Sequence, residues 1–240
     1  MSQNSEPEFN KLSFFSKISH ELRTPIHGIS SLSDYLSNNW ATLDDDIKKS
    51  CINDISKAGN LLKDLVERFF ELCCVHENNI SCYLEKINIV KIAEKTVEHN
   101  NLFITDKNSL NLFLECNKKE IYVDIDQFWI SRLLSNLISN AIKHSDAKNI
   151  QVKIDLLQND SSGQNLIISV ADDGIGIPQG ELNSIFDPFR QSSNTKKSLK
   201  GSGLGLTICR EIIKAHGGEI WAKNNDEGGT TISFNLPIRN

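Results

Sequence analysis

His20 is the first residue whose setting could support chemistry. Apolar residues around it recur every three or four positions, at Phe15, Ile18, Leu22, Ile26, Ile29, Leu32 and Leu36, which predicts a helix with one apolar seam. His20 lies two residues from both Ile18 and Leu22, so it falls on the outer face of that helix. A neutral, exposed imidazole beside Glu21, whose carboxylate can take its proton, is a competent nucleophile near neutral pH. His27 follows on nearly the same stripe, and helical geometry alone does not choose between the two histidines.

A second set of polar residues could bind a metal ion and phosphate groups. Asn136 and Asn140 are four residues apart and Lys143 follows one turn later, so the three line one face of a helix expected over 127–143. Amide oxygens are neutral ligands suited to Mg²⁺, and a lysine supplies a positive charge for phosphate. On its own, this pattern is equally consistent with a polar stripe on a half-buried helix that binds no ligand.

An acidic glycine segment has the spacing of a nucleotide-base contact. In VADDGIGIP, the pattern Asp-x-Gly-x-Gly selects Asp172, because Gly174 and Gly176 lie two and four residues later, and leaves Asp173 as the variable position. A carboxylate can accept a hydrogen bond from the exocyclic amine of adenine, whereas guanine has a carbonyl there. The glycines allow the backbone to approach the ring closely.

A second glycine segment, KGSGLGLTI, opens a helix expected over 204–216. Its glycines, Gly201, Gly203 and Gly205, let backbone amides face phosphate groups at the positive end of the helix dipole. The order of residues is neither that of a Walker loop nor that of a dinucleotide-binding motif.

Taken together, these segments resemble sensor histidine kinases of two-component systems. FFSKISHELRTPIHGI is similar to the HisKA-type dimerisation and phosphoacceptor segment of that family, whose motif His-Glu-Leu-Arg-Thr-Pro begins with the phosphorylated histidine. The resemblance implies that His20 accepts the phosphoryl group and that Glu21 acts as acid and base. It also implies that Thr24 orients water for dephosphorylation of a partner, and it gives His27 no role.

The C-terminal segments resemble the HATPase_c domain, the ATP-binding fold shared with gyrase B, Hsp90 and MutL. The resemblance implies ATP and Mg²⁺ as cofactors, with Asn140 as the magnesium ligand and Asn136 as its supporting partner. FDPFRQ resembles the segment that hinges a lid over ATP, although its phenylalanines could equally be core residues. The implied nucleotide-binding residues are Asn136, Asn140, Lys143, Asp172, Gly174, Gly176, Phe189, Lys200, Gly201, Gly203, Leu204 and Gly205.

The implied activity is that of an ATP-dependent autokinase. It would phosphorylate its own His20 and pass the phosphoryl group to an aspartate of a response-regulator receiver domain, with dephosphorylation of that regulator as a further expected activity. One alternative is an ATPase of the wider group, but its hydrolysing members carry a Glu four residues before the magnesium Asn, where this chain has Asn136. The other alternative is a non-catalytic dimer that binds nucleotide.

The phosphoacceptor histidine would be positioned by a helical hairpin over residues 9–77. A second seam runs through Ile52, Ile55, Gly59, Leu62, Val66, Phe69 and Cys73, and SNNWATLDDD separates the two helices. Two narrow seams cannot enclose a core, so we expect a homodimeric four-helix bundle. Phosphorylation within one protomer or across the dimer depends on the handedness of the turn, which the sequence does not show.

The nucleotide residues would be positioned by an α+β sandwich over residues 84–240. Apolar and polar residues alternate over 150–156 and 231–236, which predicts half-buried strands, and helical patterns cover about 88–100, 127–143 and 204–216. These elements predict helices packed on a largely antiparallel sheet.

Composition agrees with a globular protein of one or two domains. The 240 residues are 39% hydrophobic and 24% charged, with a formal net charge of −5, which argues against nucleic-acid binding. The sequence has no apolar run near the ~20 residues of a membrane-spanning helix and no signal peptide, and its six cysteines include no Cys-x-x-Cys pair. We expect a cytoplasmic location, either for the whole protein or for the cytosolic portion of a membrane-bound sensor.

Overall fold

The chain forms two compact units, Met1–Cys73 and Cys74–Asn240. A computed structural model describes residues 11–76, 82–102, 104, 110–159, 163–194 and 203–238. The predicted domain limits, 9–77 and 84–240, stay predictions, because the boundary between them falls at residues 77–81, which lie outside the described ranges. Each unit is described by itself.

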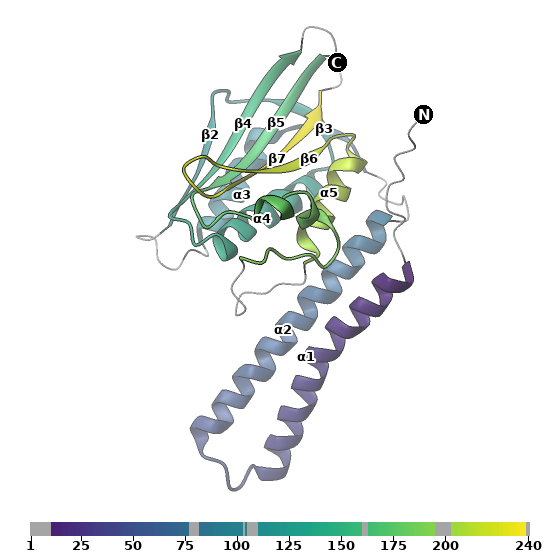
Figure 1. Cartoon of the computed structure of the whole chain (residues 1–240), viewed down its shortest axis with the longest axis vertical. Coiled ribbons are helices and arrows are strands. Elements are labelled where there is room, and N and C mark those ends of the chain that lie inside the picture. The colour runs from purple at the N-terminus through teal and green to yellow at the C-terminus, as the bar shows by residue number, and fades with distance from the viewer. Residues whose placement is uncertain are drawn as a thin grey trace. The chain divides into compact units, whose positions relative to one another are not determined.

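The first unit is a helical hairpin made of α1 (Lys11–Asn39) and α2 (Asp45–His76) (Figure 1). The backbone amides of Thr42 and Leu43 both donate to the carbonyl of Asn39, which closes the turn. Asp45 and Asp46 lie in the first turn of α2, where negative charge is favourable next to the helix dipole. α1 continues through Pro25, which is buried.

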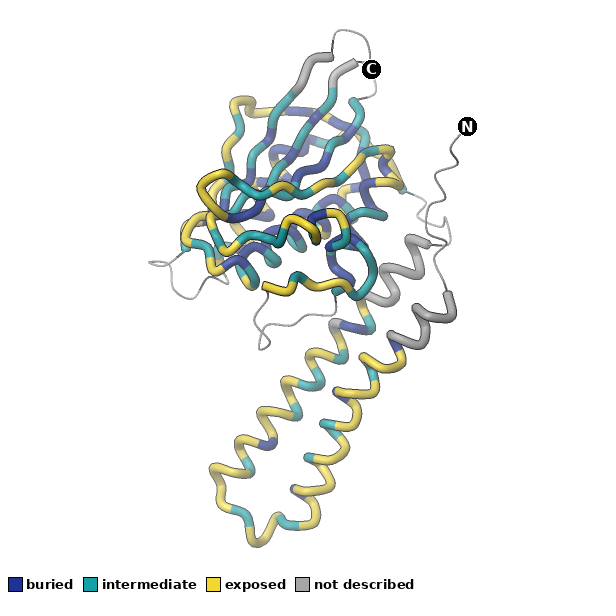
Figure 2. Tube along the Cα trace, in the orientation of Figure 1, coloured by how far each residue is buried: buried dark blue, intermediate teal, exposed yellow. Residues whose placement is uncertain are grey.

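Few of the hairpin side chains whose burial the structure describes are buried within one chain, as the largely exposed tube over these residues in Figure 2 shows. Ile18 and Leu36 of the first predicted seam are buried, but Ile26 is 46% exposed. In α2 the buried positions include Cys51, one residue before the predicted Ile52, which is 49% exposed. The seams therefore carry apolar surface that a single hairpin leaves uncovered.

The second unit contains two sheets. A two-stranded antiparallel sheet pairs β1 (Glu85–Asn88) with β3 (Tyr122–Ile125). The larger sheet has the order β2-β4-β5-β7-β6, with strands β2 (Asn111–Cys116), β4 (Asn149–Asn159), β5 (Gly163–Asp172), β7 (Thr230–Pro237) and β6 (Ile220–Asn224). Only β2 and β4 are parallel among its described pairs; the others are antiparallel.

Three helices cover one face of the larger sheet: α3 (Ile89–Leu102), α4 (Gln127–His144) and α5 (Gly205–Ala215) (Figure 1). Alternate residues of the central strands, such as Val152 and Val170, pair across the sheet and are buried. α4, which contacts β4 and β5, contributes fully buried residues such as Leu134. The predicted α+β sandwich is confirmed, and two short 3-10 turns, Gln179–Glu181 and Ser184–Phe186, follow β5.

α4 begins where the sequence predicts. Asp126 caps it, because one carboxylate oxygen accepts hydrogen bonds from the amides of Phe128 (3.0 Å) and Trp129 (3.2 Å). This cap sets the rotation of the helix that carries Asn136, Asn140 and Lys143. None of the helices in the described ranges is long and apolar enough to cross a membrane.

Candidate functional site

The histidine predicted to react is on the surface of α1. His20, Glu21 and Thr24 are all exposed, as the helical pattern predicts. The hydroxyl of Thr24 donates to the carbonyl of His20 one turn earlier, at 3.4 Å. His27 is also exposed, so exposure does not separate the two histidines.

The first residue of the polar stripe on α4, Asn136, has its side-chain nitrogen occupied. The amide nitrogen of Asn136 donates to Sγ of Cys209, a fully buried residue of α5, at 3.2 Å. The same sulfur lies 4.0 Å from the carbonyl of Leu133, which can take the thiol proton. With its nitrogen held in this way, Asn136 turns its oxygen to the other side.

Asn140 and Lys143 lie further along the same helix. Asn140 is half-buried, and its side-chain amide oxygen is of the type that Mg²⁺ accepts as a ligand. Lys143 is exposed, at the end of the helix.

Asp172 is a half-buried carboxylate with one oxygen fixed. Oδ1 accepts from the amide of Gly174 at 2.9 Å and from that of Thr230 at 3.4 Å. Burial raises the pKa of Asp172 above its usual value, an effect that these two hydrogen bonds oppose and that the nearby charge of Asp173 reinforces. The second oxygen can accept a hydrogen bond from a ligand.

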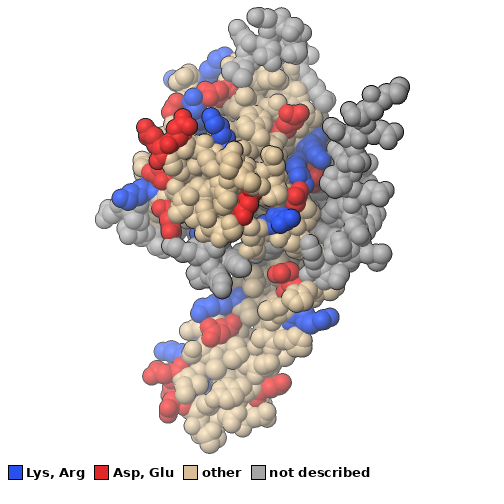
Figure 3. Space-filling model, in the orientation of Figure 1, with Lys and Arg blue, Asp and Glu red and all other residues tan. Residues whose placement is uncertain are grey.

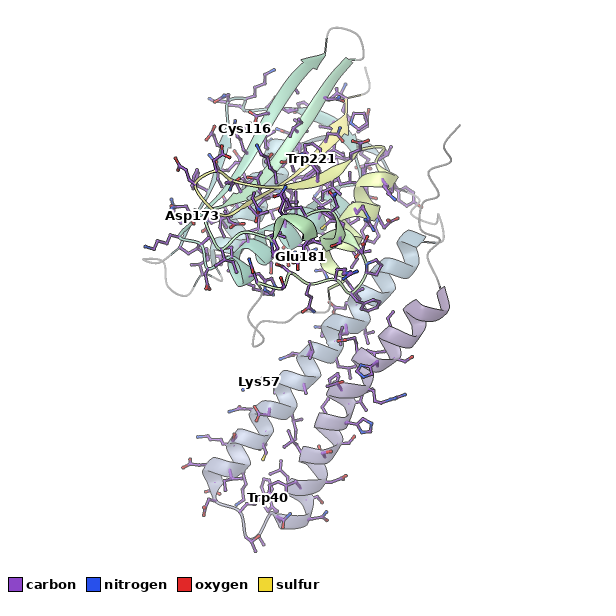
Figure 4. The ribbon with its side chains drawn as sticks, viewed as in Figure 1. Trp40, Lys57, Cys116, Asp173, Glu181 and Trp221 are labelled. Atoms are coloured by element: carbon purple, nitrogen blue, oxygen red, sulfur yellow. The ribbon has the colours of Figure 1, made fainter. Side chains whose placement is uncertain are left out.

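Asp173, labelled in Figure 4, has a structural role instead. Its carboxylate accepts from the amides of Lys148 (2.8 Å) and Asn149 (2.9 Å) and from the Asn149 side chain (2.7 Å). These hydrogen bonds lower the pKa of Asp173. Asp173 therefore ties the end of β5 to the start of β4, and the spacing that selects Asp172 agrees with this division.

The loop after Asp172 packs closely against the end of α4. A Cβ on Gly174 would collide with the carbonyl oxygen of Ser145, and the amide of Ile175 donates to that same oxygen at 2.8 Å. Gly174 is thus required for close backbone contact. The contact brings the Asp172 segment to the helix that carries the asparagines.

Two further segments meet at the backbone of Phe189 and Gly203. The amide of Phe189 donates to the carbonyl of Gly203 at 3.0 Å, and both residues have positive φ, 61° and 67°. A Cβ on Gly203 would lie 2.7 Å from the Phe189 carbonyl carbon, so glycine is needed there. Leu204 and Gly205 follow, buried at the start of α5.

Hydrogen bonds thus join the loop after β5 to the end of α4, through Ile175 and Ser145, and α4 to α5, through Asn136 and Cys209. Phe186 is buried and Phe189 half-buried, as expected both for core residues and for a hinge. Lys200 and Gly201 lie outside the described residues, as do Lys196 and Lys197. On the face drawn in Figure 3, the described charges of both signs are interspersed.

Sequence reasoning missed three polar residues that support this site. Glu181, labelled in Figure 4, accepts from the amide of Ser193 at 3.0 Å, and this bond lowers the pKa of Glu181. Asn224 and Asn225 hold the two ends of the Asp172 loop. Two adjacent asparagines before a Gly-Gly turn were the available signal, but their partners are far away in the sequence.

Comparison with known families agrees with both units. Residues 10–73 match the family described as His Kinase A (phospho-acceptor) domain. Residues 125–240 match the family described as Histidine kinase-, DNA gyrase B-, and HSP90-like ATPase. The chain therefore belongs to the histidine kinases of two-component systems. The second match supports ATP as the nucleotide.

Curated relatives are longer than this chain. It is 32% identical over 231 residues to Sensor histidine kinase WalK of Bacillus subtilis, covering 94% of this chain and 36% of the relative. It is 31% identical over 229 residues to Hybrid signal transduction histidine kinase B of Dictyostelium discoideum, covering 95% of this chain and 11% of the relative. The chain thus spans a minor part of each.

Solved structures share the fold. Histidine kinase AdeS of Acinetobacter baumannii matches with a TM-score of 0.71 and 24% identity, over 92% of this chain and 98% of that one. The catalytic domain of histidine kinase ThkA matches with a TM-score of 0.53 and 29% identity, over 65% of this chain and 97% of that one. ThkA in complex with response regulator protein TrrA matches with a TM-score of 0.70 and 24% identity, over 95% of this chain and 61% of that one.

Proposed function

We propose that this chain is an ATP-dependent protein-histidine autokinase that phosphorylates His20. The observation that carries the proposal is the exposed His20–Glu21 pair on α1, in a chain whose residues 125–240 also match the histidine kinase-type ATPase family. A ring nitrogen of His20 attacks the γ-phosphorus, the bond to the β–γ bridging oxygen breaks, and ADP leaves. Glu21 takes the ring proton. Positioning and charge neutralisation supply most of the catalysis.

Asp172 would select adenine. Its free carboxylate oxygen accepts a hydrogen bond from the exocyclic amine, while Gly174 and Thr230 hold the other oxygen in place. Gly176 belongs to the same loop and would face the ring. The carbonyl of guanine would be repelled by the carboxylate, so the pocket should discriminate against GTP.

Asn140 would hold Mg²⁺, supported by Asn136. The fit rests on amide oxygens, which suit Mg²⁺: Asn140 is half-buried on α4, and the oxygen of Asn136 is turned away from Cys209. When bound, Mg²⁺ neutralises phosphate charge. Lys143 and Lys200 would contribute positive charge toward the triphosphate, and the glycine segment would contribute backbone amides through Gly201, Gly203, Leu204 and Gly205. Lys200 and Gly201 lie outside the described residues. Phe189 would hinge the lid.

The partners we propose are a second copy of the chain and a response-regulator receiver domain. The exposed apolar residues Ile26 and Ile52 are the surface that a second hairpin would cover. ThkA, which shares the fold, is described in complex with a response regulator. Thr24, one turn from His20, would orient water when the phosphorylated regulator is hydrolysed.

Net ATP hydrolysis is the less favoured function. Asn136 stands where the hydrolysing relatives have a glutamate, and an amide cannot take a proton from water. Its nitrogen is also held by Cys209. A non-catalytic nucleotide-binding dimer remains the other alternative, and covalent labelling separates it from a kinase.

The test is incubation of the purified chain with γ-³²P-ATP and Mg²⁺. We expect protein-bound label that is lost in acid and kept in alkali, as a phosphoramidate requires. Unlabelled ATP should reduce the labelling, whereas unlabelled GTP should not. Label should then move to a receiver domain chosen from a panel. Steady release of phosphate without protein labelling would favour the ATPase, and nucleotide binding without either would favour the non-catalytic dimer.

A further inference from the structure

The side-chain amide of Asn224 is bonded to both polar groups of one distant residue. Asn224 ends β6, the edge strand that carries the labelled Trp221 in Figure 4. Its nitrogen donates to the carbonyl of Ile177 at 2.6 Å, and the amide of Ile177 donates to its oxygen at 3.0 Å. Exchanging the nitrogen and oxygen of this amide would place donor against donor and acceptor against acceptor, so only one orientation of the amide is possible. The side chain thus pairs with Ile177 as a neighbouring strand would.

Ile177 lies in the loop that begins at Asp172. This loop leaves the sheet at the end of β5 and has no strand partner. Its first half is held by backbone bonds from Asp173 to the carbonyl of Asn149 (3.3 Å) and from Ile175 to that of Ser145 (2.8 Å). Its second half is held by Asn224.

The same end of β6 also reaches the start of the loop. The amide nitrogen of Asn225 donates to the carbonyl of Asp172 at 2.8 Å, and its oxygen accepts from the hydroxyl of Thr231 at 2.6 Å. Two adjacent asparagines therefore hold residues 172 and 177, at the two ends of the loop. The turn between β6 and β7 is a structural support for the base-binding segment.

We propose that Asn224 is a positioning residue for the nucleotide, because its amide fixes Ile177 and thereby the course of the 172–177 loop. This inference rests on the proposed function, in which Asp172 contacts adenine. Without the amide, the Ile177 peptide would bond to water and the loop would adopt several conformations. ATP binding would then have to order the loop, which lowers affinity. ADP shares the adenine ring, so its affinity would fall by the same factor.

The test is Asn224→Ala in the full chain, with Asn235→Ala as its matched control. Asn235 makes a similar bond at the opposite end of the same strand pair, where its oxygen accepts from the amide of Glu219 at 2.5 Å. Equilibrium binding of ATP and ADP would be measured by displacement of a fluorescent ATP analogue. Asn224→Ala loses both hydrogen bonds to Ile177, and a longer one from the Thr230 hydroxyl (3.4 Å). Loss of the two Ile177 bonds should weaken both nucleotides about tenfold. Asn235→Ala should leave both affinities unchanged, even if its melting temperature falls.

Autophosphorylation kinetics give a second readout. Loosening the loop removes binding that the ground state and transition state share, so KM for ATP should rise while kcat stays the same. A merely structural role would lower the active fraction and therefore kcat. A lowered kcat with unchanged KM would overturn the proposal.

Unchanged nucleotide affinity in Asn224→Ala, or an equal loss in Asn235→Ala, would also overturn the proposal. If Asn224→Ala does not fold, the isosteric Asn224→Asp replaces it. That variant sets a carboxylate oxygen against the Ile177 carbonyl and should weaken ATP at least as much; unchanged binding would overturn the proposal. An unaltered chain that binds no ATP would contradict the proposed function itself.

Discussion

At the residue scale, the adjacent residues Asp172 and Asp173 have different roles: we propose that Asp172 binds the nucleotide, whereas Asp173 holds two strands together. Asp173 uses both carboxylate oxygens to join β5 to β4, whereas Asp172 keeps one oxygen for a ligand. Glycine spacing selects Asp172 in the sequence. The hydrogen bonds of Asp173 could not be predicted, because its partners lie 24 and 25 residues away.

Asp172→Asn should weaken ATP binding strongly and leave the fold intact. A hydrogen bond to a charged group contributes about 1.5–3 kcal/mol, so we expect ATP affinity to fall roughly 10- to 100-fold. The control is Asp173→Asn, which should lower the melting temperature but not the affinity. Isothermal titration calorimetry with circular dichroism tests both. Equal affinities for the unaltered chain and Asp172→Asn would refute the adenine contact.

The raised pKa of Asp172 predicts how affinity and stability depend on pH. Adenine needs the ionised carboxylate, so ATP affinity should fall as pH decreases, starting at a higher pH than for an ordinary aspartate. The folded state favours the protonated form, so this group stabilises the fold below its unfolded pKa, and that contribution is lost as pH rises through the folded pKa. Asp172→Asn should therefore be no less stable than the unaltered chain at neutral pH. Melting curves over a pH series test this, and a marked loss of stability at neutral pH would contradict it.

At the element scale, His216 and Asp126 join the ends of two helices to the segment before β1. The amide of Asp126 donates to Nε2 of His216 at 3.1 Å, so Nδ1 carries the proton, which it donates to the carbonyl of Ile212 at 2.8 Å. The second carboxylate oxygen of Asp126 accepts from the amide of Tyr83 at 3.2 Å. Burial lowers the pKa of His216. The hydrogen bond to Ile212 and the charge of Asp126 act in the opposite direction and raise this pKa.

This arrangement predicts that acid weakens the catalytic unit. The unfolded chain takes up a proton at His216 near pH 6.5, whereas the folded chain resists it. The contribution to stability is therefore present above that pH and is lost as pH falls toward the folded pKa. His216→Gln should melt at a lower temperature at pH 7.5, because buried hydrogen bonds are lost at about 1–3 kcal/mol each. Its melting temperature should then change less between pH 7.5 and 5.5 than that of the unaltered chain, and an equal change would count against His216 as the titrating group.

Local patterns predict elements better than they predict pairing. The period of apolar residues gives α4 to within one residue at its end, and alternation gives the cores of β4 and β7. The parallel pairing of β2 with β4 could not be predicted, because α4 and β3 separate the two strands in sequence. The bond from Asn224 to Ile177 spans 47 residues and escaped prediction for the same reason.

At the scale of the whole molecule, the proposed four-helix bundle predicts that a second copy of the hairpin covers the exposed apolar residues. Ile52 is 49% exposed in one chain although it lies on the predicted seam. A lysine there would be buried in a four-helix bundle without a partner, so Ile52→Lys should weaken the dimer by about 100-fold or more. The neighbouring Asn53 is exposed, and Asn53→Lys adds the same charge without effect. Size-exclusion chromatography with light scattering tests both, and a monomeric, active chain would contradict the bundle.

The central claim is that the phosphoryl group of ATP arrives on His20. The most direct measurement compares ³²P incorporation in His20→Gln and His27→Gln, two changes at exposed histidines of the same helix, each with ATP affinity measured in parallel. We predict that His20→Gln binds ATP normally and takes up no label, while His27→Gln is labelled like the unaltered chain. Normal labelling of His20→Gln, or loss of label only in His27→Gln, would contradict the assignment.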